Sequence, residues 1–88
     1  DARSFSLRLA FARHLAPSAR LALLERRRAV LMQRLGETES GARPDLDSYA
    51  RSVVEHTADG VTRDINWLDS LIASERAALA DARPEPVG

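Results

Sequence analysis

One apolar row in the second half of the chain constrains the fold more than any other feature. Between positions 54 and 79 the row recurs at alternating spacings of four and three residues, and seven of its eight positions are apolar. Such spacing is typical of a long helix packed against other helices in a coiled-coil-like seam. We therefore predict a helix over about residues 46–80. The row consists of Val54, Ala58, Val61, Ile65, Leu68, Ile72, Glu75 and Leu79.

A second row lies beside the first on the same predicted helix. Two adjacent apolar rows give this helix more apolar surface than one antiparallel neighbour can cover. An exposed apolar patch of that size marks an association site, and twofold self-association is the commonest oligomeric arrangement. The pattern predicts a homodimer in which the long helices, and parts of the preceding helices, pack across the symmetry axis. The second row consists of Val53, Gly60, Trp67 and Leu71.

Two further helices are predicted before the long one. The first covers about residues 5–15, with Ser4 as its expected N-cap, and the second covers about residues 17–39. We expect an elbow at Ala16-Pro17, because proline disfavours helix at the residue before it but fits the first turn of a new helix.

The only clear internal turn is predicted at residues 40–45, with Asp45 as the expected N-cap of the long helix. No strand-like alternation of apolar and polar residues appears in the sequence. The predicted fold is therefore all-α: a short helix plus two long antiparallel helices that pair into a dimeric coiled-coil-like helical bundle. We expect one helical dimerisation domain over residues 1–80 and a disordered tail over residues 81–88.

Counting back from the turn predicts which residues of the two long helices face each other. A short loop favours antiparallel neighbours, so Val54 is expected near Leu31 and Val61 near Leu24. Trp67 is then expected opposite the elbow. The same count places Leu71 and Ile72 near Phe11 and Leu15, and Glu55 and Asp59 across from Arg27 and Arg28.

These rows supply the candidate interaction residues. Trp67 is the only tryptophan, and the simpler interpretation is a core residue that fills the gap where two helices bend over a third. The sharper hypothesis is that Trp67 and Phe11 line a pocket for a small apolar effector near the elbow. The predicted core and dimer interface consists of Leu24, Leu31, Val54, Val61, Ile65, Leu68 and Ile72.

Composition argues against several classes of site. Thirteen acidic residues balance thirteen arginines, whereas a stand-alone nucleic-acid binder usually carries a basic excess. The chain has no cysteine, which removes disulfides and thiolate zinc sites. Around His56 only Glu55 and Asp59 have a spacing that could assist metal binding, and that pattern is weak, so we expect His14 and His56 to be surface or hydrogen-bonded residues. No nucleophile–base pair or phosphate-binding glycine loop is present, and we expect no enzyme activity, metal or cofactor.

No apolar run approaches the roughly 20 residues of a membrane span, and no signal-peptide pattern opens the chain. We therefore expect a cytoplasmic protein without a membrane partner. The chain opens at Asp1 instead of Met and enters a helical pattern within a few residues, as a fragment of a longer protein would.

Three segments together resemble the C-terminal domain of PadR-like transcriptional regulators, also called the virulence activator alpha C-terminal domain. They are residues 21–28, residues 49–56 and residues 67–72 (Trp-Leu-Asp-Ser-Leu-Ile), and the resemblance extends over about residues 5–75. The family often has glycine after the Glu-His pair, where this chain has Thr57. The resemblance implies a helical domain that holds two copies of a repressor together. It also implies that DNA is contacted only through an N-terminal winged helix absent from this chain, and that some members bind a small apolar effector.

Two other functions remain open on the sequence alone. The same apolar groove suits an autonomous helical adaptor that binds an amphipathic helix of another protein. Direct nucleic-acid binding by this chain would show itself as a steep dependence on salt.

Overall fold

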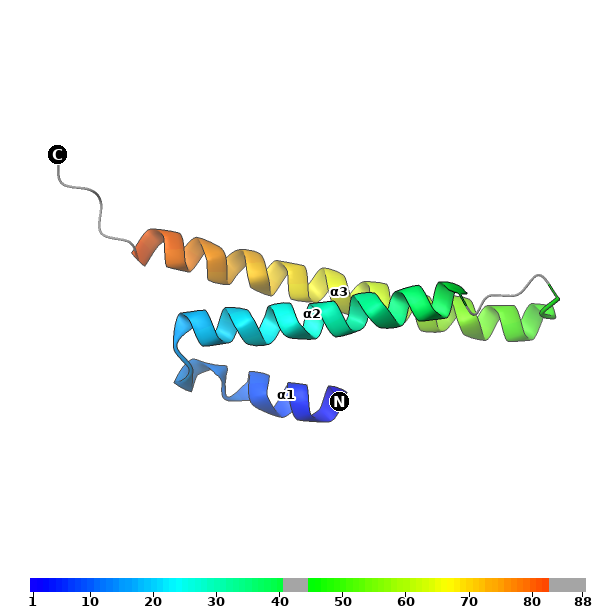
Figure 1. Cartoon of the computed structure of the whole chain (residues 1–88), viewed down its shortest axis with the longest axis horizontal. Coiled ribbons are helices and arrows are strands. Elements are labelled where there is room, and N and C mark those ends of the chain that lie inside the picture. The colour runs from blue at the N-terminus through cyan, green and yellow to red at the C-terminus, as the bar shows by residue number, and fades with distance from the viewer. Residues whose placement is uncertain (41–44, 83–88) are drawn as a thin grey trace.

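The computed structural model describes residues 1–40 and 45–82, and within these ranges it contains helices and no strand (Figure 1). The all-α prediction is confirmed. None of the described helices is long and apolar enough to cross a membrane. The predicted turn falls mostly on residues 41–44, outside the described residues. The helices are α1 (Ala2–Ala10), the short 3-10 helix η1 (Ala12–His14), α2 (Pro17–Ser40) and α3 (Ser48–Ala82).

Aspartate carboxylates cap two of these helices, and neither cap is the residue predicted. The Oδ1 atom of Asp1 accepts a hydrogen bond of 2.7 Å from the backbone N–H of Ser4, so α1 begins earlier than the predicted cap at Ser4. At α3 the N–H of Ala50 donates to Oδ1 of Asp47 at 2.8 Å, instead of to Asp45. The predictions failed because more than one polar residue precedes each helix at a distance suitable for capping.

The predicted elbow is present. Leu15 adopts an extended backbone, with φ −93° and ψ 148°, and α2 begins at Pro17. Arg20 stabilises this bend, because its Nη1 atom donates to the Leu15 carbonyl oxygen at 2.9 Å. The first helix ends at Ala10, sooner than predicted, and η1 covers part of the remaining distance to the elbow.

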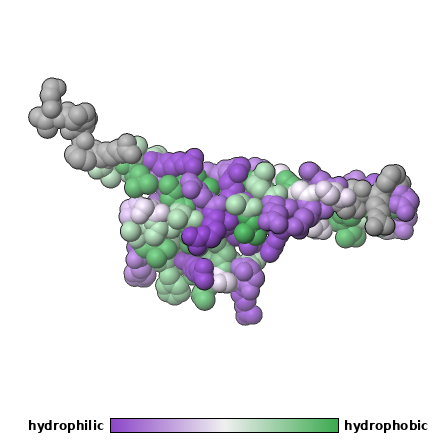
Figure 2. Space-filling view, in the orientation of Figure 1, coloured by the Kyte–Doolittle hydropathy of each residue, from purple (hydrophilic) through white to green (hydrophobic). Residues whose placement is uncertain are grey.

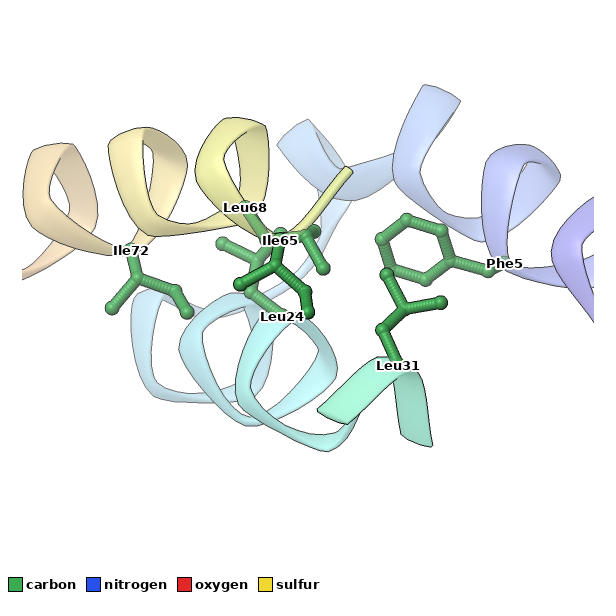
Figure 3. Packing of buried hydrophobic residues seen from close by; sticks show 6 residues of the cluster. All are labelled: Phe5, Leu24, Leu31, Ile65, Leu68 and Ile72. Carbon is green, nitrogen blue, oxygen red and sulfur yellow. The ribbon is translucent and has the colours of Figure 1, made fainter. Parts of the chain in front are cut away.

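The core lies where α1, α2 and α3 meet (Figure 3). Leu68 of α3 is completely buried at its centre. Phe5 is the one buried residue of α1, and Figure 3 shows its ring beside Leu31 of α2. The buried cluster consists of Phe5, Leu24, Leu31, Ile65, Leu68 and Ile72, with Leu9, Leu21, Leu23, Leu35, Val61 and Leu71 packed around it.

The two long helices are antiparallel, as predicted, but their register differs from the predicted one. Three ion pairs align residues 20–28 of α2 with residues 69–76 of α3. This alignment is about twelve residues, or roughly 18 Å at 1.5 Å per residue, away from the predicted one, which set Leu24 opposite Val61. The pairing of Glu55 and Asp59 with Arg27 and Arg28 is also wrong. The ion pairs are Arg20–Glu75, Glu25–Arg76 and Arg28–Asp69.

A physical reason for the offset is the size of the side chains that it buries. Ile65, Leu68 and Ile72 are buried against α2 and α1, and they carry more apolar area than Val54, Ala58 and Val61 would in the predicted register. As a result, about the first two turns of α3 extend beyond the last residue of α2, at the green end of the helix in Figure 1. We call residues 48–55 the α3 overhang.

Replacement of Gly36 by alanine is expected to stabilise the chain. Gly36 lies inside α2, and a Cβ atom added there meets nothing within 4 Å. Alanine lowers the backbone entropy of the unfolded chain, so Gly36→Ala should raise the free energy of unfolding by about 0.5–1 kcal/mol. Thermal unfolding followed by circular dichroism, at matched protein concentration, measures this change. An unchanged or lower melting temperature contradicts it.

The register can be tested with double-mutant cycles. Arg20→Gln and Glu75→Gln should show a coupling energy of about 0.5–1 kcal/mol, because the two side chains form a partly buried ion pair. The matched cycle uses Arg27→Gln and Asp59→Asn, two residues that the loop count brings together, and should show no coupling. A larger coupling in the second cycle than in the first would mean that the predicted register is correct.

Candidate interaction surface

The helix α1 carries apolar side chains on two opposite sides. At about 100° per residue, Leu7 and Phe11 project away from the side that Phe5 and Leu9 present to the core. Leu7 is 64% exposed and Phe11 is 58% exposed. A helix that is apolar on more than one side is normally covered on each of them, so the outer side of α1 is a candidate contact surface.

This outer side forms a shallow apolar depression with the start of α2. The rings of Phe11 and His14 stack with their centroids 6.5 Å apart, and Leu15 is exposed at the elbow. Figure 2 shows hydrophobic residues, in green, at the end of the molecule where α1 and the elbow lie. We call this the α1 face; it is lined by Leu7, Arg8, Phe11, His14, Leu15 and Leu23.

The α3 overhang is a second exposed apolar region. Tyr49 is 86% exposed and Val53 is 66% exposed, because α2 ends before it reaches them. Tyr49, Val53, Gly60 and Trp67 fall along one side of α3. The predicted second apolar row therefore lies largely at the surface.

Trp67 is half-exposed and lies away from the elbow. Its ring meets the ring of Phe5 edge-on, with centroids 6.5 Å apart and planes at 85°, a favourable aromatic arrangement. The guanidinium carbon of Arg27 lies 5.4 Å from the centroid of the Phe5 ring, within the range of a cation–π contact. Trp67 thus packs against the first half of α1, and its predicted position opposite Pro17 is wrong.

The structure divides the predicted interaction residues between the core and the surface. Leu24, Leu31, Ile65, Leu68 and Ile72 are buried within one chain. Val54 and Val61 are half-buried. Five of the seven residues predicted for the core and dimer interface are thus buried in the core of a single chain.

The two predicted pocket residues are in separate depressions. Trp67 shares one with Phe5 and Leu31, whereas Phe11 lies on the α1 face with Leu7 and Leu23. An effector site built from both would need a different arrangement of α1. The sequence signal for the α1 face is the four-residue spacing of Leu7, Phe11 and Leu15.

Glu75 is the polar member of the main α3 row. Its Oε1 atom accepts a hydrogen bond of 3.0 Å from Nε of Arg20, and the two side chains are 22% and 24% exposed. The other carboxylate oxygen, Oε2, is buried without a hydrogen-bond partner among the described residues. Since Arg20 also holds the Leu15 carbonyl, this pair links the elbow to α3.

The remaining ion pairs lie at the surface. Arg28 donates to Asp69, and this hydrogen bond, followed by the attraction of the carboxylate, raises the pKa of the Arg28 guanidinium above its ordinary value. Arg76 donates to Glu25 at 2.8 Å. All these side chains are well exposed, so solvent screens their attraction; they align the helices more than they stabilise them.

A search for metal ligands in the described part of the chain finds no group of three histidine, aspartate or glutamate side chains that could hold an ion. His14 accepts a hydrogen bond of 3.2 Å on Nε2 from Nε of Arg13. Both His14 and His56 are exposed, as predicted.

Comparison with known families finds one matching model. The model of the family described as virulence activator alpha C-term matches residues 3–74, which span α1, η1, α2 and most of α3. No significant match was found among curated proteins or among solved structures.

Truncation of the central core residue is expected to be costly. Leu68→Ala leaves a cavity at a site with no exposure, and such changes cost about 2–5 kcal/mol. Met32→Ala is the matched control, since Met32 is 45% exposed and its truncation should cost much less. Urea unfolding of both variants at equal concentration measures the difference. Equal losses would contradict the core described above.

Proposed function

Because the chain belongs to the virulence activator alpha C-terminal family, we propose that it is the dimerisation domain of a PadR-type transcriptional repressor. The family assignment itself makes it a transcription-regulator-type domain. In the proposal, two copies of this domain hold together two DNA-binding winged helices located elsewhere in the full-length protein. The domain itself is not catalytic.

The observation that carries this proposal is the apolar surface that one chain leaves uncovered. The Cα atoms span 65 × 30 × 14 Å, so the helices form a thin layer and much of their surface faces solvent. Among the described residues, six hydrophobic side chains are buried, whereas eight large ones are between 39% and 86% exposed. A chain of this length buries only about 60% of its unfolded surface and commonly needs further support. A second copy would supply that support.

The charges favour a partner other than DNA for this chain. Its net charge is zero, and phosphate neutralisation by a basic excess is what normally supplies affinity for nucleic acid. In the proposed regulator, DNA recognition therefore belongs to the winged helix. The contribution of the present domain is to fix the distance and the symmetry between two winged-helix domains, as in other dimeric repressors.

Sedimentation equilibrium tests the proposal directly. The chain is expected to have the mass of a dimer at micromolar concentration, with circular dichroism at the same concentration to verify that it is helical. A helical monomer at that concentration would contradict the proposal. In a parallel measurement, a duplex DNA probe at low salt should remain unbound; binding that falls steeply with salt would instead assign nucleic-acid recognition to this chain.

A further inference from the structure

The net charge is unevenly distributed between the two ends of the molecule. Residues 1–28 contain seven arginines and two acids. Of these arginines, Arg3, Arg8, Arg13 and Arg26 are exposed and take part in none of the ion pairs found in the described part of the chain. The part of the chain that carries the α1 face therefore has a net positive charge, and Arg8 lines the face itself.

The opposite end carries the opposite charge. Residues 45–59 contain four acids and one arginine. Glu55 and Asp59 are exposed, lie one helical turn apart, and form no ion pair with any described residue. Asp59 lies about 80° around α3 from Tyr49, whereas Glu55 lies on nearly the opposite side of the helix from Val53. The α3 overhang and the next helical turn of α3, which contains Asp59, thus combine exposed apolar side chains with net negative charge.

The two surfaces complement each other in both chemistry and charge, but one chain cannot bring them together. The three internal ion pairs fix the α3 overhang beyond the end of α2. Figure 1 shows α1 beside the first half of α2, away from the overhang. Contact between the α1 face and an overhang therefore requires two molecules.

We propose that the α1 face of one copy of this chain binds the α3 overhang of a second copy. A twofold axis makes this contact twice, because the overhang of the first copy then meets the α1 face of the second. Leu7, Phe11 and Leu15 cover Tyr49 and Val53, and Arg8 faces Asp59 on the neighbouring side of α3. Complementary charge of this kind selects the partner and the orientation more than it supplies affinity.

This inference rests on the proposed dimer and specifies the residues that form it. Two single charge reversals test it: Arg8→Glu on the α1 face and Asp59→Arg on α3. Each variant alone should dimerise at least about tenfold more weakly than the unaltered chain, because each reversal acts at both contacts of the dimer and places like charges together. An equimolar mixture of the two variants should form a heterodimer with affinity restored to nearly that of the unaltered chain, because opposite charges then meet at both contacts.

Two control variants make the same changes of charge elsewhere. Arg34→Glu on α2 and Asp81→Arg at the end of α3 replace exposed residues outside both surfaces, and each should dimerise within about twofold of the unaltered chain. Analytical ultracentrifugation, with one variant carrying a fluorescent label, measures homodimers and the mixed dimer separately.

The outcomes separate this contact from the proposed function. Weakened single variants together with a restored mixture support the contact. If the unaltered chain is a dimer and neither reversal weakens it more than the controls do, the proposed contact is wrong while dimerisation remains. If the mixture fails to restore affinity after both single reversals weaken it, the two surfaces do not face each other. A folded monomer of the unaltered chain overturns the dimer itself.

Discussion

The register between α2 and α3 determines the rest of this structure. Leu24 and Leu31 of α2 belong to one buried cluster with Ile65, Leu68 and Ile72 of α3, which brings the largest aliphatic side chains of the two helices together. Burial of apolar area is the dominant favourable term in folding. This alignment is therefore more stable than one in which the end of α2 lies beside the start of α3. The ion pairs then follow the hydrophobic alignment.

Two consequences of that alignment concern the surface. The N-terminal turns of α3 are left without a neighbour from α2 (Figure 1), so Tyr49 and Val53 are exposed. The C-terminal half of α3 packs against α1, where the ring of Trp67 contacts the ring of Phe5. On the other side of α1, Leu7 and Phe11 remain exposed. In the proposed dimer, a second such layer of helices covers the apolar residues at both ends, and the unequal charge of the two ends orients it.

Much of the fold follows from the sequence because it depends on local patterns. The four-three spacing predicts α3 to within about two residues at each end, and Pro17 fixes the elbow and the start of α2. The register does not follow, since a count from the loop assumes that α3 turns back beside the last turn of α2, whereas the packing of Ile65 to Ile72 decides the alignment.

The candidate surface was harder to predict for the same reason. Ile65 and Leu68, which were predicted for the core and dimer interface together, are buried in the core of one chain. Val53, which belongs to the second apolar row of the same helix, is exposed. Leu7 and Phe11 carry a recognisable spacing, but only the packing of Phe5 shows which side of α1 faces inward. Sequence periodicity identifies apolar sides of helices; the three-dimensional alignment decides which of them a partner can reach.

The central claim is that the apolar surface left over by a single chain is covered by a second copy. The dependence of the thermal unfolding temperature on protein concentration tests it most directly, because association of folded chains shifts unfolding by mass action. For a dimer, the melting temperature should rise steadily as the concentration of the chain is increased over about two orders of magnitude. A melting temperature that is the same at every concentration, for a chain that unfolds reversibly in this range, would contradict it.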